Sequence, residues 1–443
     1  MDFLKDIAIP QPIEHFHLLV LIAAMSSLIL IPYLGFLLGS SGLSLYYNRR
    51  ARNGGDALPL AFAKSLIDDA LHTKGLVAFL ALIPGLSLAF VYGQMLQGTP
   101  AIATGLAGFG FLFLAAAVLM LYSYKYTFRL RGLLDSHGGE GEPAGPGIED
   151  YKRTNLRAHM RAGRYGFAFL LASLFLFGSA ITVTESPGSW AAVASVFDVF
   201  ISGAAWLKFL EFIALAGGIT GSLVPALASR RGEHEGELMR RVSVRLCTAS
   251  LLALPALVIL NIVLLPDEAL SSLAYGIPAG ALALLFIAAH FVYGYHRRAG
   301  AKAVVASAAA FLAAGVLIVA GDHAALAVAT KPQAARLASV SDALTEEVRA
   351  KLGFTATVMT GEDIYNAKCS SCHMFNVKKV GPPYNVVLKK YVGRKSAMVA
   401  FVMDPVKVDP EYPSMPNQAL RPAEADSIVA YLLARISPSG PAK

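Results

Sequence analysis

Charged residues are scarce in this chain of 443 residues. Asp, Glu, Lys and Arg make up only 15% of it, whereas 55% of its residues are hydrophobic. Soluble globular domains have about 25% charged residues. The composition therefore excludes a soluble protein of this size and favours one that lies largely in a membrane.

Eight apolar segments are each long enough to cross a bilayer, which takes about 20 helical residues. They are apolar on all sides, which excludes the amphipathic helices of a soluble bundle. They lie near 16–40, 75–96, 101–124, 165–184, 205–228, 246–265, 271–295 and 303–321. The sequence therefore predicts an all-α protein, with a polytopic bundle of about eight transmembrane helices at residues 1–323, surrounded by membrane lipid.

Lysine and arginine are missing from every second connection between these segments. The connections near 97–100, 185–204 and 266–270 contain neither residue. By the positive-inside rule, the arginine-rich connections face the cytoplasm, so both termini face outward. We therefore expect a multi-pass protein of the bacterial inner membrane with both ends on the periplasmic side. The basic clusters are Arg49, Arg50 and Arg52; Arg153, Arg157, Arg161 and Arg164; Arg240, Arg241 and Arg245; Arg297, Arg298 and Lys302.

Short motifs recur in the same order in the two halves of the membrane part. Leu80-Ala81-Leu82-Ile83-Pro84 is followed later by Leu252-Ala253-Leu254-Pro255, and Tyr122-Ser123-Tyr124 by Tyr293-Gly294-Tyr295. Aromatic residues also collect at helix ends for interfacial reasons, so each match alone is weak. Their shared order favours a 4+4 repeat of two parallel four-helix halves.

Cysteine is also rare, and two of the three cysteines lie in Cys369-Ser370-Ser371-Cys372-His373. This is the attachment motif of a c-type haem, in which both thiols bind the haem covalently and the histidine ligates the iron. The alternative is half of a zinc site, which would need two more Cys or His ligands. Only Cys247 remains, far upstream in an apolar segment, so the motif predicts one covalent haem c on Cys369, Cys372 and His373.

Three further features accompany the motif. Gly361 and Tyr365 precede Cys369 at intervals of four residues, so they share a helix face with it. Gly381-Pro382-Pro383 follows the histidine, and Tyr412-Pro413-Ser414-Met415-Pro416 lies about 40 residues beyond it. With these features, residues 355–438 resemble the class I c-type cytochromes.

The resemblance implies the roles of several residues. The carbonyl of Pro382 would bind the second ring nitrogen of His373. Tyr365, which shares a helix face with Cys369, is a further candidate for binding the cofactor. Met415 would be the second axial ligand of the iron. The alternatives for that ligand are Met398 and Met403, but they lie in a helical stretch where methionine is usually core filler. A methionine ligand raises the potential and fills the coordination site, which suits an electron carrier.

Residues 324–352 read as a linker, and residues 353–443 as a small all-α cytochrome c domain. Basic residues cluster soon after the haem motif, at Lys378, Lys379, Lys389, Lys390, Arg394 and Lys395. They would attract a redox partner with an acidic docking surface, although a basic solvated face is the simpler reading. Nucleic acid is not an expected partner, because the domain lies outside the cytoplasm.

Two groups of polar residues accompany the membrane segments. His17, near the start of the first, and His323, just past the eighth, would lie on the same outer side and could ligate a haem b. Histidines at helix ends are also common interfacial residues. Lys208 and Glu211 lie on one turn of the fifth segment, where charges are costly unless paired. They either neutralise each other, or Glu211 serves a quinone site or a proton path.

The sequence thus predicts a membrane-bound c-type cytochrome of a respiratory or photosynthetic chain. It would transfer electrons between a quinol-oxidising system and a periplasmic acceptor or oxidase, together with other respiratory subunits. One alternative is a quinol:cytochrome c oxidoreductase with its own membrane haem b. Another is a redox-sensing transporter or sensor.

Overall fold

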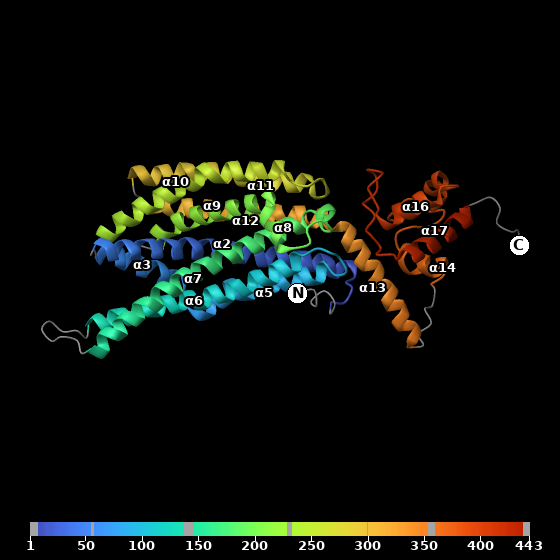
Figure 1. Ribbon diagram of the computed structural model, residues 1–443. Helices are drawn as coiled ribbons and strands as arrows, with labels where there is room; N and C mark the ends of the chain where they lie inside the picture. The colour runs from blue at the N-terminus through green and yellow to red at the C-terminus, as the bar shows by residue number, and fades with distance from the viewer. Residues whose placement is uncertain are drawn as a thin grey trace, which may run out of the picture. The chain divides into compact units, whose positions relative to one another are not determined.

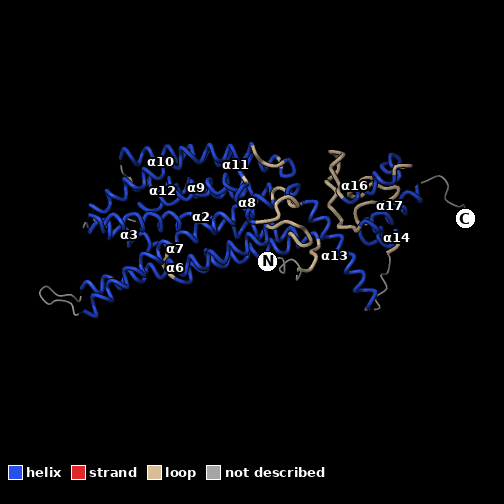
Figure 2. The backbone as a smooth tube through the Cα atoms, in the orientation of Figure 1, coloured by secondary structure: helices blue, strands red, loops and turns tan. Residues whose placement is uncertain are grey.

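The computed structural model describes residues 8–54, 57–136, 146–227, 233–298, 300–352 and 359–436. Over these residues it contains helices and loops and no strand (Figures 1 and 2). The chain divides into two compact units, Met1–Leu344 and Thr345–Lys443. The expected all-helical organisation is confirmed, with a membrane part followed by a small helical C-terminal part.

Eight helices in the described part of the chain are long and apolar enough to cross a membrane. They are α2 (Ile13–Gly54), α4 to α5 (Lys74–Met95), α6 (Ala103–Ser136), α7 (Pro146–Thr184), α9 (Gly203–Leu227), α10 (Glu233–Val263), α11 (Ser272–Arg298) and α12 (Ala301–Ala329). The second of these contains a π-helical turn, η1 (Ala78–Leu82), which ends two residues before Pro84. Proline lacks the N–H that an α-helix needs, and a π-helical turn is one way to accommodate a break in the hydrogen-bond ladder.

Several helices extend beyond the apolar segments at the arginine-rich end. Helix α2 has 42 residues and α7 has 39, which gives each a length of about 60 Å. A helix that the sequence analysis did not predict, α3 (Ala57–Ala70), packs against α2 here. It is held by hydrogen bonds from Tyr33 Oη to the Ala70 carbonyl (2.8 Å) and from Ser44 Oγ to the Ala63 carbonyl (2.6 Å).

Small residues let α2 and α9 approach each other closely. A Cβ added at Gly35 would lie 3.2 Å from Cα of Ala216, and one added at Gly39 would collide with Thr220. The Thr220 hydroxyl donates to the Gly35 carbonyl across this contact (3.1 Å). Close approach through small residues is a usual way to hold membrane helices together, since lipid removes the hydrophobic drive to associate.

Helices α6 and α7 form an antiparallel hairpin, and so do α11 and α12 (Figure 1). These pairs occupy corresponding places in the two proposed halves. The 4+4 repeat itself stays a prediction.

The C-terminal part is built from short helices around a small core. They are α14 (Gly361–Ile364), η4 (Tyr365–Cys369), α15 (Tyr384–Val387), η5 (Leu388–Tyr391), α16 (Lys395–Met403) and α17 (Pro422–Ile436). The apolar stripe of α17 is buried, at Ala425, Ile428, Val429 and Leu432. Helix α14 crosses α17 at Gly361, where a Cβ would lie 2.5 Å from the Ser427 carbonyl oxygen and collide with Tyr431. Only glycine fits this crossing.

The sequence predicts three parts of the chain: a membrane bundle at 1–323, a linker at 324–352 and a cytochrome c domain at 353–443. Residues 324–329 continue α12, and α13 (Lys331–Lys351) is helical throughout. Gln333 Nε2 donates to the carbonyls of Met95 (3.1 Å) and Gln97 (3.0 Å), and Ala334 and Leu337 are buried. The first half of the proposed linker is therefore packed into the membrane unit.

Candidate functional site

The C-terminal part contains a large cavity whose wall includes both cysteines of the motif, His373, Pro382 and Met415. Its volume is about 1390 Å³, including the part that is open to solvent. The rest of the wall is mostly apolar and includes Val387, Leu388, Met398, Val402, Leu420, Ile428 and Leu432. A cavity that is mostly apolar with a few converging polar groups is the usual form of a cofactor site.

The backbone of the motif turns the two thiols and the imidazole toward this one cavity. The Ser370 N–H donates to the Tyr365 carbonyl (2.8 Å), closing the π-helical turn η4, and the His373 N–H donates to the Cys369 carbonyl (2.9 Å). Both thiols are free of disulfides, and Cys369 is buried while Cys372 is partly exposed. Burial raises the pKa of the Cys369 thiol, so it stays neutral until it reacts.

The imidazole of His373 is held from three sides. Its Nδ1 lies 2.9 Å from the Pro382 carbonyl oxygen, which can only accept, so Nδ1 carries the proton and Nε2 keeps its lone pair for a metal. The ring stacks on Tyr384, with centroids 4.9 Å apart. A Cβ at Gly381 would collide with it. This is the contact with Pro382 that the resemblance implies, whereas iron ligation stays a prediction.

Of the three candidate methionines, Met415 and Met398 line the cavity and Met403 does not. Met398 is 2% exposed and belongs to the core of this part. Met415 is half-buried in a loop. That loop is fixed by Asn417, whose Nδ2 donates to the Met403 carbonyl (3.0 Å) and whose Oδ1 accepts from the Ala419 N–H (2.8 Å). Met415 stays the predicted ligand, and Met398 is the alternative with access to the cavity.

Replacing Met415 by Ala should lower the reduction potential and remove the absorption features of sulfur ligation, because a thioether ligand stabilises ferrous iron. Spectroelectrochemical titration of the purified protein measures both. Met403→Ala is the matched control and should change neither. If Met398→Ala or Met403→Ala has this effect instead of Met415→Ala, the ligand is misassigned.

Tyr365 lies behind the motif, and the cavity wall does not include it. Its hydroxyl donates to the His373 carbonyl (3.3 Å), and its ring packs near Phe375 (5.2 Å) and Tyr431 (6.0 Å). In this position Tyr365 supports the backbone of the motif, and its contact with the haem stays a prediction.

A Cys-x-x-Cys-His segment whose thiols and imidazole open on one apolar cavity, together with a methionine in the same wall, defines a c-type cytochrome domain. Residues 358–435 match the family Cytochrome c. A curated relative, cytochrome c-552 of Hydrogenobacter thermophilus (strain DSM 6534 / IAM 12695 / TK-6), is 36% identical over 90 residues, which are 19% of this chain and 90% of the relative. Through this domain the chain belongs to the cytochrome c family. No solved structure matches it.

The family implies one covalent haem c and electron transfer, and the residues present fit this cofactor. When bound, the haem supplies a one-electron iron couple. Cys369 and Cys372 would hold it, His373 would be oriented toward it by Pro382, and the apolar wall would exclude water. The protein is thus a membrane protein with a C-terminal electron-transfer domain.

The two histidines proposed for a membrane haem b differ in their surroundings. His17 is exposed on α2. His323 is 5% exposed inside α12, and neither of its ring nitrogens has a hydrogen-bond partner in the part of the chain that is described. No hydrogen bond or ring contact is seen between the two. A haem b on this pair stays a prediction.

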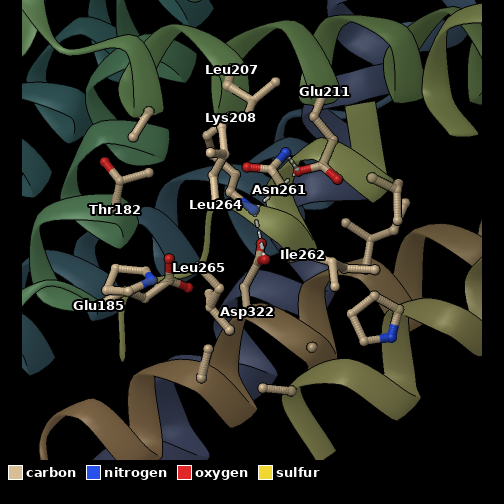
Figure 3. A pocket seen from close by; sticks show the side chains of 18 of the residues that line it. Thr182, Glu185, Leu207, Lys208, Glu211, Asn261, Ile262, Leu264, Leu265 and Asp322 are labelled. Atoms are coloured by element: carbon tan, nitrogen blue, oxygen red, sulfur yellow. Dashed lines mark hydrogen bonds and ion pairs between the residues drawn. The ribbon is translucent and has the colours of Figure 1, made fainter. Parts of the chain in front are cut away.

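Lys208 and Glu211 do pair, and further polar groups join them. Lys208 Nζ lies 3.0 Å from Glu211 Oε2 and 2.7 Å from Asp322 Oδ1, and Asn261 Nδ2 donates to Glu211 Oε2 (2.9 Å) (Figure 3). The side chains of the two α9 residues are only 4% and 2% exposed. The sequence indicated the first pair, since it lies on one turn. It missed Asp322 because the eighth segment was expected to end at 321.

A buried histidine near the arginine-rich end was also missed. His159 of α7 is 1% exposed and stacks on Tyr124 at 4.3 Å. Its Nδ1 lies 2.8 Å from Thr127 Oγ1, and its Nε2 accepts from Asn48 Nδ2 (2.9 Å). Both ring nitrogens have protein partners, so the arrangement fits a structural role in joining α2, α6 and α7. The arginine-rich sequence around it gave no signal of burial.

Proposed function

We propose that this protein is a membrane-bound c-type cytochrome that carries electrons between a quinol-oxidising system and a periplasmic acceptor or oxidase. It would act in a respiratory or photosynthetic chain as a subunit of a larger complex. The observation that supports this is the cavity shared by Cys369, Cys372, His373 and Met415. With His373 and Met415 as axial ligands, neither side of the iron would be open to oxygen, so transfer of electrons is the remaining chemistry.

The proposed orientation places the cytochrome c domain and both termini on the periplasmic side. Two arguments support it. The basic clusters lie at one end of the long helices, which the positive-inside rule assigns to the cytoplasm. In addition, c-type haem is attached outside the cytoplasm, so the domain has to be exported.

The proposed partner has an acidic docking surface. Three lysines, Lys368, Lys390 and Lys407, contribute to the wall of the haem cavity, and the amine of Lys378 lies 4.6 Å from the centre of the Tyr412 ring, which is also in that wall. Other basic residues of the cluster have local partners: Lys395 pairs with Asp426 (2.7 Å), and Lys379 donates to the Ser370 carbonyl (3.0 Å). Positive charge at the cavity rim would steer an acidic protein toward the haem edge.

Reversing two rim charges, Lys390→Glu and Lys407→Glu, should slow electron transfer to an acidic acceptor several-fold at low salt. High ionic strength should remove most of the difference, because exposed charges are screened within about 8–10 Å. Stopped-flow oxidation of the full-length protein in detergent, with an acidic soluble cytochrome as acceptor, measures the rate.

The matched control carries Arg349→Glu and Lys351→Glu, an equal charge change on α13. The control should keep nearly the parent rate. Equal slowing in both variants would mean that net charge alone acts, and no slowing in the rim variant would rule out docking at the haem edge.

A second candidate is a quinol:cytochrome c oxidoreductase with its own haem b. The observation that favours it is His323, a buried imidazole in a membrane helix whose nitrogens have no protein partner among the described residues. A haem b with two axial histidines would need a second imidazole, and His17 is exposed. The electron carrier is therefore the better supported function.

A further inference from the structure

A second cavity lies inside the membrane unit, between α7, α9, α10, α11 and α12 (Figure 3). The charged and amide side chains in its wall are Glu185, Lys208, Glu211, Asn261 and Asp322. Its volume is about 70 Å³. A single water needs only about 10–15 Å³, so the cavity has room for water. The polar groups in its wall would give that water hydrogen-bond partners.

The cavity lies at the end of the helices whose connections carry no lysine or arginine. Glu185 directly follows α7, Lys208 lies near the start of α9, and Asn261 lies near the end of α10. The connections 185–204 and 266–270 adjoin these residues, and Ser186 and Pro266 belong to the cavity wall. By the charge argument above, this end faces the periplasm.

The charges in this cavity do not balance. Lys208 is the one ammonium, and it contacts Asp322 and Glu211. The third carboxyl, on Glu185, is 4% exposed, and its Oε1 has no hydrogen-bond partner among the residues described. An unpaired carboxylate in such a place is strongly disfavoured, so the group takes up a neutralising ligand instead.

Apart from Lys208, which is already paired with Asp322 and Glu211, the ionisable groups near Glu185 supply no positive charge. Lys208, Glu211 and Asp322 are the charged residues that interact with it electrostatically, and Tyr92 of α5 is a neutral neighbour. Glu268, in the loop after α10, lies beside Gly188 and is another acid. No group of three or more His, Cys, Asp or Glu within the described ranges could hold a metal ion. The neutralising ligand that remains is a proton.

We propose that Glu185 is a proton-binding site in a water-filled cavity at the periplasmic end of the bundle. Its carboxylate takes a proton from a hydronium ion, forming the neutral acid and a water, and returns it by the reverse step. Lys208, Asp322 and Glu211 form a fixed ion-paired frame around the cavity. Such a site can accept the proton that oxidation of a quinol or another hydrogen donor releases at this side of the membrane. It does not depend on the electron-transfer function of the C-terminal domain.

Infrared spectroscopy of the full-length protein in lipid nanodiscs tests this proposal. At neutral pH we expect the carbonyl stretch of a protonated carboxyl, and this band should shift to lower frequency in D₂O because the proton exchanges through the cavity water. Glu185→Gln should remove it. The matched control is Glu268→Gln, which neutralises an exposed acid on the same side and should leave the band in place. The c-type haem content of each sample reports that the protein was made and assembled.

The proposal is overturned if the parent protein shows no such band, or if the band is unchanged in Glu185→Gln. A band that fails to shift in D₂O would show a trapped proton and contradict exchange with the cavity water. If Glu185→Gln does not accumulate in the membrane, Glu185→Asp keeps the carboxyl and should move the band. If the band stays at the parent frequency in Glu185→Asp, it belongs to another residue, and this result would also contradict the proposal.

Discussion

Cys369→Ser together with Cys372→Ser is expected to yield a protein with no covalently bound haem. A serine hydroxyl does not form the thioether through which the haem is attached, and each single substitution should leave one attachment point. The remaining thiol, on Cys247, is 1% exposed within helix α10, so it cannot substitute for either cysteine. Haem staining after denaturing electrophoresis should therefore lose the signal in the double variant, while the chain itself is still detected by antibody.

Cys247→Ser is the matched control and should retain full staining. It removes a thiol from the chain without touching the haem cavity. Persistent covalent haem in the double variant would contradict the assignment of the motif. Loss of haem in Cys247→Ser would point to a failure of membrane insertion instead of attachment.

The parts of this protein that could be predicted from sequence are those set by local pattern. In a membrane, a run of about 20 apolar residues can form few structures other than a spanning helix. The sequence predicts eight such spans, and the described residues contain eight helices of suitable length. The haem motif is equally local, because both thiols and the imidazole come from five consecutive residues. Pro382 followed from the family resemblance, and it lies within hydrogen-bond distance of His373.

At the end of the last span, the local sequence pattern predicts the wrong helix boundary. Gly321-Asp322-His323 looks like the polar end of a segment, yet α12 continues to Ala329. His323 is buried inside this helix, and the side chain of Asp322 is only 12% exposed. Asp322 is tolerated inside this helix because another helix supplies its partner. That partner, Lys208, is 114 residues away in the chain. No periodicity within a single segment reveals such a pairing. Glu185 and Asn261 were missed for the same reason.

The proposed linker shows a similar limit. Its composition, rich in alanine with one proline, is compatible with a flexible connection. Pro332 instead occupies the first turn of α13, where its missing N–H does no harm because that N–H would have no partner within the helix. Helix α13 then docks on the membrane unit through Gln333, whose amide reaches two carbonyls at the end of the second span. That contact is long-range, so composition could not predict it.

Lys208→Met should destabilise the membrane unit strongly. The side chain keeps much of its length but loses the positive charge that pairs with Glu211 and Asp322, both of which Lys208 Nζ contacts at 3.0 Å or less. Removing one partner of a buried ion pair costs about 3–5 kcal/mol, because the other charge stays buried and unpaired. Thermal denaturation of the purified protein in one detergent should show a lower midpoint, together with a lower yield from membranes.

A rescue experiment can show whether the instability of Lys208→Met comes from the lost charge or from lost packing. The triple variant Lys208→Met, Glu211→Gln and Asp322→Asn removes the unpaired charges as well, so it should recover much of the lost stability.

A surface pair gives the matched comparison: Lys395 Nζ also lies 2.7 Å from an Asp426 carboxylate oxygen, but the two side chains are 47% and 60% exposed. Lys395→Met should therefore cost no more than about 1 kcal/mol. If Lys208→Met is as mild as Lys395→Met, the buried carboxyls are already neutral without the lysine, and the ion-paired frame around the cavity does not exist. A triple variant no more stable than Lys208→Met would instead show that the lysine stem, and not its charge, holds α9 against α12.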